Sequence, residues 1–142
     1  MPRIEGGCFC GAIRYRVTAP IAGTAACHCR KCQYGSGGGP NYVALAPRDA
    51  FEIIAGSPAT HISKADTGVD VTRAFCATCG TPLYSDTPNL PFRAIRVGSL
   101  DDPSNMAPAI HIWTGAAPPW HPIEPGALVF AKGPGGAGDR RL

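Results

Sequence analysis

"GGCFCG" at residues 6–11 and "FCATCG" at residues 75–80 place two close cysteine pairs in separate parts of a 142-residue chain. Two residues lie between the cysteines of the second pair, a spacing that lets both sulfurs reach one ion, and glycines beside both pairs allow tight turns. Structural zinc takes four ligands, mostly thiolates, that usually arrive as two short pairs. Either pair alone is also typical of buried cysteines or of a redox dithiol. Together they predict one closed zinc site, formed by Cys8, Cys10, Cys76 and Cys79.

Three further cysteines lie within the six residues "CHCRKC" at 27–32. Three protein ligands and an open position are typical of catalytic zinc. We therefore predict that Cys27, Cys29 and Cys32 form the catalytic centre and hold a second zinc, which binds more weakly because it has one ligand fewer. A metal-free cysteine cluster and closure of the site by a histidine are the alternatives. The candidate fourth ligands are His28, whose ring is expected to point away from the ion, and His61, His111 and His121.

The charge of such a site indicates what it could bind. Three thiolates around Zn²⁺ leave a net charge of about −1, so the ion lowers the pKa of a bound water less than a histidine-ligated zinc does. A histidine-ligated zinc lowers the pKa of its bound water to roughly 7. Soft thiolate ligands beside an open position suit a substrate thiol, because coordination removes the thiol proton. A thiol substrate is therefore favoured over hydrolysis.

The composition favours an all-β fold of short strands with no long helices. The chain has 18 glycines and 15 prolines, which interrupt helices, and 44% hydrophobic residues, enough for a packed core. In "IRYRVT" at 13–18, Ile13, Tyr15 and Val17 alternate with polar residues, the pattern of a half-buried strand. Further short runs predict strands at 41–46, 51–54, 69–75, 94–97, 109–113 and 127–130.

Length and charge limit the other possibilities. We expect one domain at residues 1–131 and a disordered tail at 132–142, because the glycine-rich end has little to bury. No stretch approaches the roughly 18 apolar residues of a membrane span, and no signal peptide is apparent, which predicts a cytoplasmic protein. The net charge of +3 includes no long basic block, so neither nucleic acid nor a membrane is an expected partner.

Several segments occur together in an order and spacing typical of one family. They are "GGCFCGAIRY", "CHCRKCQ", "FCATCGTPLY", "GSLDDP" and "PAIHIW…PPW", and they extend from Gly6 to Trp120. The chain in this respect resembles the family named for the glutathione-dependent formaldehyde-activating enzyme, which includes the centromere protein V group. The resemblance implies a compact zinc-bearing fold of the β-tent kind. It also implies that the two cysteine pairs hold the structural zinc and that the other three cysteines hold the second zinc.

The resemblance implies a carbon–sulfur lyase that adds the sulfur of glutathione to formaldehyde and forms S-hydroxymethylglutathione. Glutathione would then be a cosubstrate, and Arg30, Lys31 or Arg73, each near a cysteine group, are candidates to pair with its carboxylates. Two alternatives remain from the residues themselves. One is a non-catalytic zinc-binding module that stabilises a protein partner, and the other is a redox switch that uses Cys29 and Cys32.

Overall fold

A computed structural model describes residues 3–134 and 139–140. The described chain is mostly β, with two sheets of short strands and one short α-helix, which confirms the predicted fold class. Most strand pairs are antiparallel, but β10 pairs in parallel with both β3 and β11. In this part of the chain no helix has the length and apolar character needed to cross a membrane.

The chain divides into two compact units, which are described separately. The first contains Met1–Gly23 and Ala44–Asn105, and the second contains Thr24–Val43 and Met106–Leu142. Strand β4 (Asn41–Pro47) begins in the second unit and ends in the first. The prediction of a single domain with a disordered tail stays a prediction, and most of that tail lies outside the described residues.

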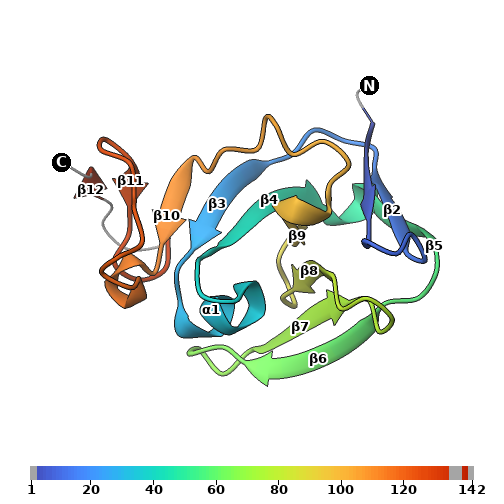
Figure 1. Cartoon of the computed structure of the whole chain (residues 1–142), viewed down its shortest axis with the longest axis horizontal. Coiled ribbons are helices and arrows are strands. Elements are labelled where there is room, and N and C mark those ends of the chain that lie inside the picture. Colours follow the sequence, from blue (N-terminus) through green and yellow to red (C-terminus); the bar gives the residue numbers. More distant parts are fainter. Residues whose placement is uncertain (1–2, 135–138, 141–142) are drawn as a thin grey trace. The chain divides into compact units, whose positions relative to one another are not determined.

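The first unit contains a three-stranded sheet and a run of three antiparallel hairpin strands followed by β9 (Figure 1). Its strands are β1 (Ile4–Gly7), β2 (Arg14–Val17), β5 (Phe51–Ala55), β6 (Ala59–Lys64), β7 (Asp70–Phe75), β8 (Pro82–Asp86) and β9 (Phe92–Arg96). Two 3₁₀ turns, η1 (Arg48–Ala50) and η2 (Val97–Ser99), precede β5 and follow β9. The turn with Cys8 and Cys10 joins the antiparallel strands β1 and β2. The turn with Cys76 and Cys79 joins the antiparallel strands β7 and β8.

The core of the first unit follows from the alternation of β2. Ile13, Tyr15 and Val17 are at most 3% exposed, as the sequence pattern predicts. The Tyr15 hydroxyl lies 2.6 Å from the Ser99 hydroxyl, and its ring stacks on Phe51. A side chain at Gly6 would collide with the Tyr15 hydroxyl, so glycine is required where β1 crosses this buried ring.

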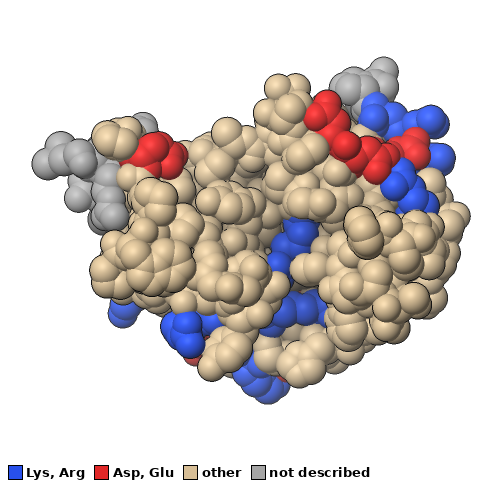
Figure 2. Space-filling model, in the orientation of Figure 1, with Lys and Arg blue, Asp and Glu red and all other residues tan. Residues whose placement is uncertain are grey.

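Charged side chains cover the outer face of the three-stranded sheet. Arg16 lies between Glu5 and Glu52, and Arg14 makes a two-pronged ion pair with Asp101. In Figure 2 the acidic and basic groups lie side by side over this sheet, at the upper right of the view. Charges of both signs offset one another here, and no large patch of one sign forms on this sheet.

The second unit contains the short helix and a group of strands in which β10 has a neighbour on each side. Its elements are β3 (Gly23–Cys27, whose first residue belongs to the first unit), α1 (Arg30–Ser36), β10 (Ile110–Ile112), the 3₁₀ turn η3 (Thr114–Ala116), β11 (Leu128–Val129) and β12 (Asp139–Arg140). The described strand order is β12, β11, β10, β3. Gly37 ends α1 in the left-handed conformation, with φ 87°, which a glycine adopts without steric cost. The turn from β3 into α1 carries the remaining three cysteines.

Candidate metal centres

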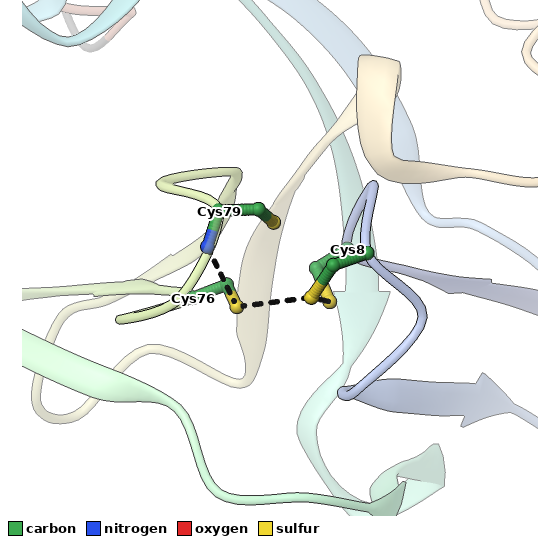
Figure 3. A group of neighbouring side chains, drawn as sticks. Cys8, Cys76 and Cys79 are labelled. Atoms are coloured by element: carbon green, nitrogen blue, oxygen red, sulfur yellow. Dashed lines mark hydrogen bonds between the residues drawn. The ribbon is translucent and has the colours of Figure 1, made fainter.

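The first candidate centre is the four-cysteine site, formed by Cys8, Cys10, Cys76 and Cys79. Its ligand atoms all lie within 4.8 Å of one another, which brings together the two pairs that the sequence predicts. Figure 3 shows Cys8 on one turn, and Cys76 and Cys79 on the other, with their sulfurs pointing toward one another. Both turns belong to the first unit, so this centre is built entirely within it.

The two turns that carry these cysteines are built alike. The N–H of Gly11 donates to the Cys8 carbonyl at 3.0 Å, and the N–H of Gly80 donates to the Cys76 carbonyl at 2.8 Å. Both glycines have positive φ, +81° and +79°, a conformation that other residues adopt only with strain. This explains why a glycine follows each pair in the sequence.

Backbone and hydroxyl groups stabilise the sulfurs. The N–H of Ile13 donates to the Cys8 sulfur at 3.2 Å, and the Cys79 N–H approaches the Cys76 sulfur at 3.5 Å. The Thr81 hydroxyl lies 3.1 Å from the Cys79 sulfur and accepts the N–H of Phe9. Hydrogen bonds from the Thr81 side chain, and also from backbone groups, lower the pKa of Cys79 to about 5. Thr81 therefore links the two turns and favours the thiolate that a metal requires.

The spacing of the sulfurs fits zinc. A Zn–S bond of about 2.3 Å implies sulfur separations of roughly 3.8 Å in a tetrahedron. The Cys8 and Cys10 sulfurs are 3.5 Å apart, and those of Cys10 and Cys76 are 3.8 Å apart. All these cysteines are free, and no disulfide competes for the sulfurs within the described residues. The four-cysteine site can therefore hold a metal ion, and its all-thiolate donor set suits zinc.

The second candidate centre is the cysteine trio, Cys27, Cys29 and Cys32, in the second unit. Its three sulfurs also lie within 4.8 Å of one another. Cys27 ends β3, Cys29 is the N-cap of α1, and Cys32 lies in the first turn of the helix. The Cys29 sulfur accepts the N–H of Cys32 at 3.3 Å. The strand-to-helix turn therefore brings the three sulfurs together over only six residues.

The three thiols of the trio differ in acidity. Hydrogen bonds from the thiols of Cys27 and Cys32, followed by backbone N–H groups, lower the pKa of Cys29 to about 2. The pKa of Cys27 is raised, mainly because its thiol is hydrogen-bonded to the Cys29 sulfur. Negative charge in the metal-free trio therefore concentrates on Cys29, the sulfur at the beginning of α1.

Among the described residues, no histidine or carboxylate joins either cysteine group. His61 lies exposed on β6, in the first unit. His28 is fully buried, its Nε2 lies 2.9 Å from Nδ1 of His111, and the ring of His121 meets it edge-on. None of the four candidate histidines therefore lies with the sulfurs of the trio.

The three cationic residues predicted to bind glutathione lie in different settings. Arg30 and Lys31 are exposed on α1, in the same unit as the trio. The Arg30 guanidinium donates to Gln33 at 2.6 Å and lies over the ring of Tyr34. Arg73 is on β7, in the first unit, and donates to the Ser63 hydroxyl. Their role toward glutathione stays a prediction.

Sequence reasoning did not identify four polar side chains that lie in or around the two centres. They are Thr81 beside the four-cysteine site, and Gln33, Asn41 and Glu124 in the second unit. Gln33 donates to the backbone carbonyl of His28, and the amide of Asn41 bonds the Cys32 thiol. Of these four, only Thr81 could have been found from the sequence, because it lies two residues after a candidate ligand, Cys79, in a tight turn.

A family model and a named relative point to the same family. A family model described as "Glutathione-dependent formaldehyde-activating enzyme" matches residues 3–116. A provisionally named glutathione-dependent formaldehyde-activating enzyme of Halomonas elongata is 28% identical over 127 residues, which are 85% of this chain and 81% of that protein. The crystal structure of a Rhodobacter sphaeroides protein is similar with a TM-score of 0.54 and 22% identity, covering 68% of this chain and 87% of the other. This last likeness concerns the fold alone.

Proposed function

Because the chain belongs to the family of glutathione-dependent formaldehyde-activating enzymes, we propose that it is a zinc-dependent carbon–sulfur lyase acting on a thiol–aldehyde adduct. The adduct is S-hydroxymethylglutathione or a close relative. In the forming direction, the thiol sulfur bonds to the aldehyde carbon while the carbon–oxygen double bond becomes a single bond, and the proton that leaves sulfur ends on the aldehyde oxygen. The reverse reaction releases the thiol and the aldehyde.

The observation that carries the proposal is the cysteine trio. Its three sulfurs lie within 4.8 Å, and no histidine or carboxylate of the described residues joins them. Zinc bound there would offer an open position at which a substrate thiol is held as its thiolate. The net charge of about −1 on three thiolates and Zn²⁺ makes activation of water less effective than at a histidine-ligated zinc. A thiol substrate therefore fits this centre better than a hydrolytic reaction.

The residues around the trio support the same role. Cys29, with its low pKa, is ready to bind a metal without losing a proton at neutral pH. Arg30 and Lys31 follow it on the exposed side of α1 and are our candidates to pair with a glutathione carboxylate. The four-cysteine site is proposed to hold structural zinc, because its four thiolates leave no position for a substrate.

The proposal can be tested by exchange spectroscopy, because the adduct also forms without a catalyst. With ¹³C-formaldehyde, glutathione and zinc-loaded protein, we expect faster exchange between free formaldehyde and the adduct than the spontaneous rate. Cys29→Ser should return exchange to the spontaneous rate while keeping the metal of the four-cysteine site. A second small thiol, 2-mercaptoethanol, would show whether glutathione is preferred.

A fully loaded protein that accelerates exchange with neither thiol would overturn the proposal. The non-catalytic zinc-binding module and the redox switch would then remain as alternatives.

A further inference from the structure

We infer that Glu124, acting through His111, fixes the orientation of His28 and thereby positions the sulfurs of Cys27 and Cys29. The three residues form the Glu124–His111–His28 chain of hydrogen bonds. His28 Nε2 lies 2.9 Å from His111 Nδ1, and His111 Nε2 lies 3.1 Å from a carboxylate oxygen of Glu124. Glu124 is thus a positioning residue for the trio, although it is not itself a candidate ligand.

His28 is held from several directions. Its N–H donates to the Ile112 carbonyl at 2.9 Å, and its carbonyl accepts the side-chain amide of Gln33 at 2.9 Å. Its ring stacks on that of His111, with 5.2 Å between centroids, and is completely buried. Neither the backbone nor the ring of His28 can turn without breaking one of these contacts.

The position of His28 in the chain makes its ring important for the sulfurs. It is the single residue between Cys27, at the end of β3, and Cys29, whose φ of −63° and ψ of 158° are extended. In extended backbone, neighbouring side chains point to opposite sides, and residues two apart point to the same side. A fixed His28 ring on one side therefore keeps both cysteine sulfurs on the other.

The Glu124–His111–His28 chain of hydrogen bonds also has a direction, which is set by Glu124 at its exposed end. An ionised carboxylate can only accept hydrogen bonds, so Glu124 requires the proton of His111 to be on Nε2. In the neutral imidazole the other nitrogen carries no proton, so His111 Nδ1 accepts a hydrogen bond from the Nε2–H of His28. The pKa of Glu124 is lowered by its own backbone N–H and by His111, which keeps the carboxylate ionised at neutral pH. Glu124 thereby determines the tautomers of both buried rings.

The consequence for metal binding rests on the proposed function, because it assumes a metal at the trio. Groups that orient metal ligands without touching the ion typically change metal affinity 10–100-fold when they are replaced. Glu124 is 59% exposed, whereas His111 is almost fully buried. Replacing Glu124 therefore disturbs the hydrogen-bond chain without opening a cavity in the core.

The first experiment reads the tautomers directly and needs no metal. A long-range ¹H–¹⁵N correlation spectrum of histidine-labelled protein at pH 8 should show His28 and His111 both protonated on Nε2. In Glu124→Ala, His111 should lose its single tautomer and become a mixture. A His28 ring protonated on Nδ1 in the unaltered protein would overturn the inference.

The second experiment measures zinc affinity at the trio by competition with a coloured chelator. We expect Glu124→Ala to weaken zinc binding there by roughly 10–100-fold. Glu124→Gln keeps an oxygen that accepts the His111 proton and should stay within about threefold of the unaltered protein. The matched control is Glu52→Ala, which removes a carboxylate of the same 59% exposure from the first unit.

The outcomes separate this inference from the proposed function. Equal zinc affinity in Glu124→Ala and Glu52→Ala would overturn the positioning role. An unaltered protein that binds only one zinc would instead overturn the metal site at the trio. In that case the predicted effect of Glu124 on zinc affinity would be wrong too. The tautomers of His28 and His111 would still test whether the hydrogen-bond chain exists.

Discussion

At the scale of single residues, Tyr15 combines complete burial with a defined hydrogen bond. The Ser99 hydroxyl donates to the Arg96 carbonyl at 2.8 Å, so it is the Tyr15 hydroxyl that donates to Ser99. Burial raises the pKa of Tyr15 to about 12. The folded protein therefore resists ionisation of this phenol more than the unfolded chain does.

The sign of the pH dependence follows from this shift. The folded-state pKa exceeds the ordinary value of 10, so the stabilisation is complete below pH 10 and is lost as the pH rises to about 12. We predict that the free energy of unfolding falls more steeply over this range in the unaltered protein than in Tyr15→Phe. Urea titrations at pH 8, 10 and 11.5 would measure the free energy of unfolding of both proteins. An equal fall with pH in the unaltered protein and in Tyr15→Phe would contradict the prediction.

Cys29 has two separable roles, as a candidate metal ligand and as the N-cap of α1. Serine caps helices well, whereas replacing a capping residue by alanine costs about 1 kcal/mol. We predict that Cys29→Ser and Cys29→Ala both lose the second metal, and that only the alanine variant loses additional stability. Metal analysis per chain and thermal unfolding would show this, and equal stability of the two variants would argue against the capping role.

At the scale of elements, the turn between β7 and β8 depends on Gly80. Its φ of +79° and its N–H bond to Cys76 shape the loop that presents two sulfurs. A left-handed conformation costs an L-residue about 1–2 kcal/mol. We predict that Gly80→Ala destabilises the protein by about that amount and weakens the metal of the four-cysteine site.

Gly98 provides the control for this prediction. Apart from its chain neighbours and its own 3₁₀ turn, no atom of the described residues lies within 4 Å of the position of an added Cβ there, and its φ is not in the left-handed range. Chemical unfolding and chelator competition should leave Gly98→Ala close to the unaltered protein. A loss in Gly98→Ala as large as that in Gly80→Ala would mean that backbone strain at the turn is not the cause.

At the scale of the whole molecule, the two candidate centres should differ in what they stabilise. The four-cysteine site ties the turn after β1 to the turn after β7, and structural zinc contributes on the order of 10 kcal/mol to folding. A protein of this size has a net stability of only about 5–15 kcal/mol. We predict that Cys76→Ser unfolds the chain, whereas Cys29→Ser stays folded without its second metal.

The same difference predicts the order of metal loss. The trio has one ligand fewer, so mild chelation should remove its metal first and leave the metal of the four-cysteine site in place. Circular dichroism and metal analysis during a chelator titration would follow both events. If Cys29→Ser unfolded the chain and Cys76→Ser were tolerated, the structural and functional roles would be assigned the wrong way round.

Features that depend on local spacing could be predicted from the sequence. The two cysteine groups, the alternation of β2 and the glycines after each cysteine pair follow from short-range geometry, and the structure contains them. The sequence does not predict strands β1, β3, β6, β8 and β12, because short segments rich in glycine, alanine or polar residues lack a clear alternation. The seven-residue helix α1 was not predicted either, since it is too short to show a helical period.

Only the tertiary structure decided which distant residues support the two centres. Thr81 meets Phe9 across the four-cysteine site, and Glu124 meets His111 from a loop rich in proline and glycine. Such contacts depend on how strands far apart in sequence pair, as β10 pairs with β3, and no local pattern encodes them. The sequence determined the candidate ligands because the spacing within each cysteine group is local, whereas the partners that orient them were decided by long-range packing.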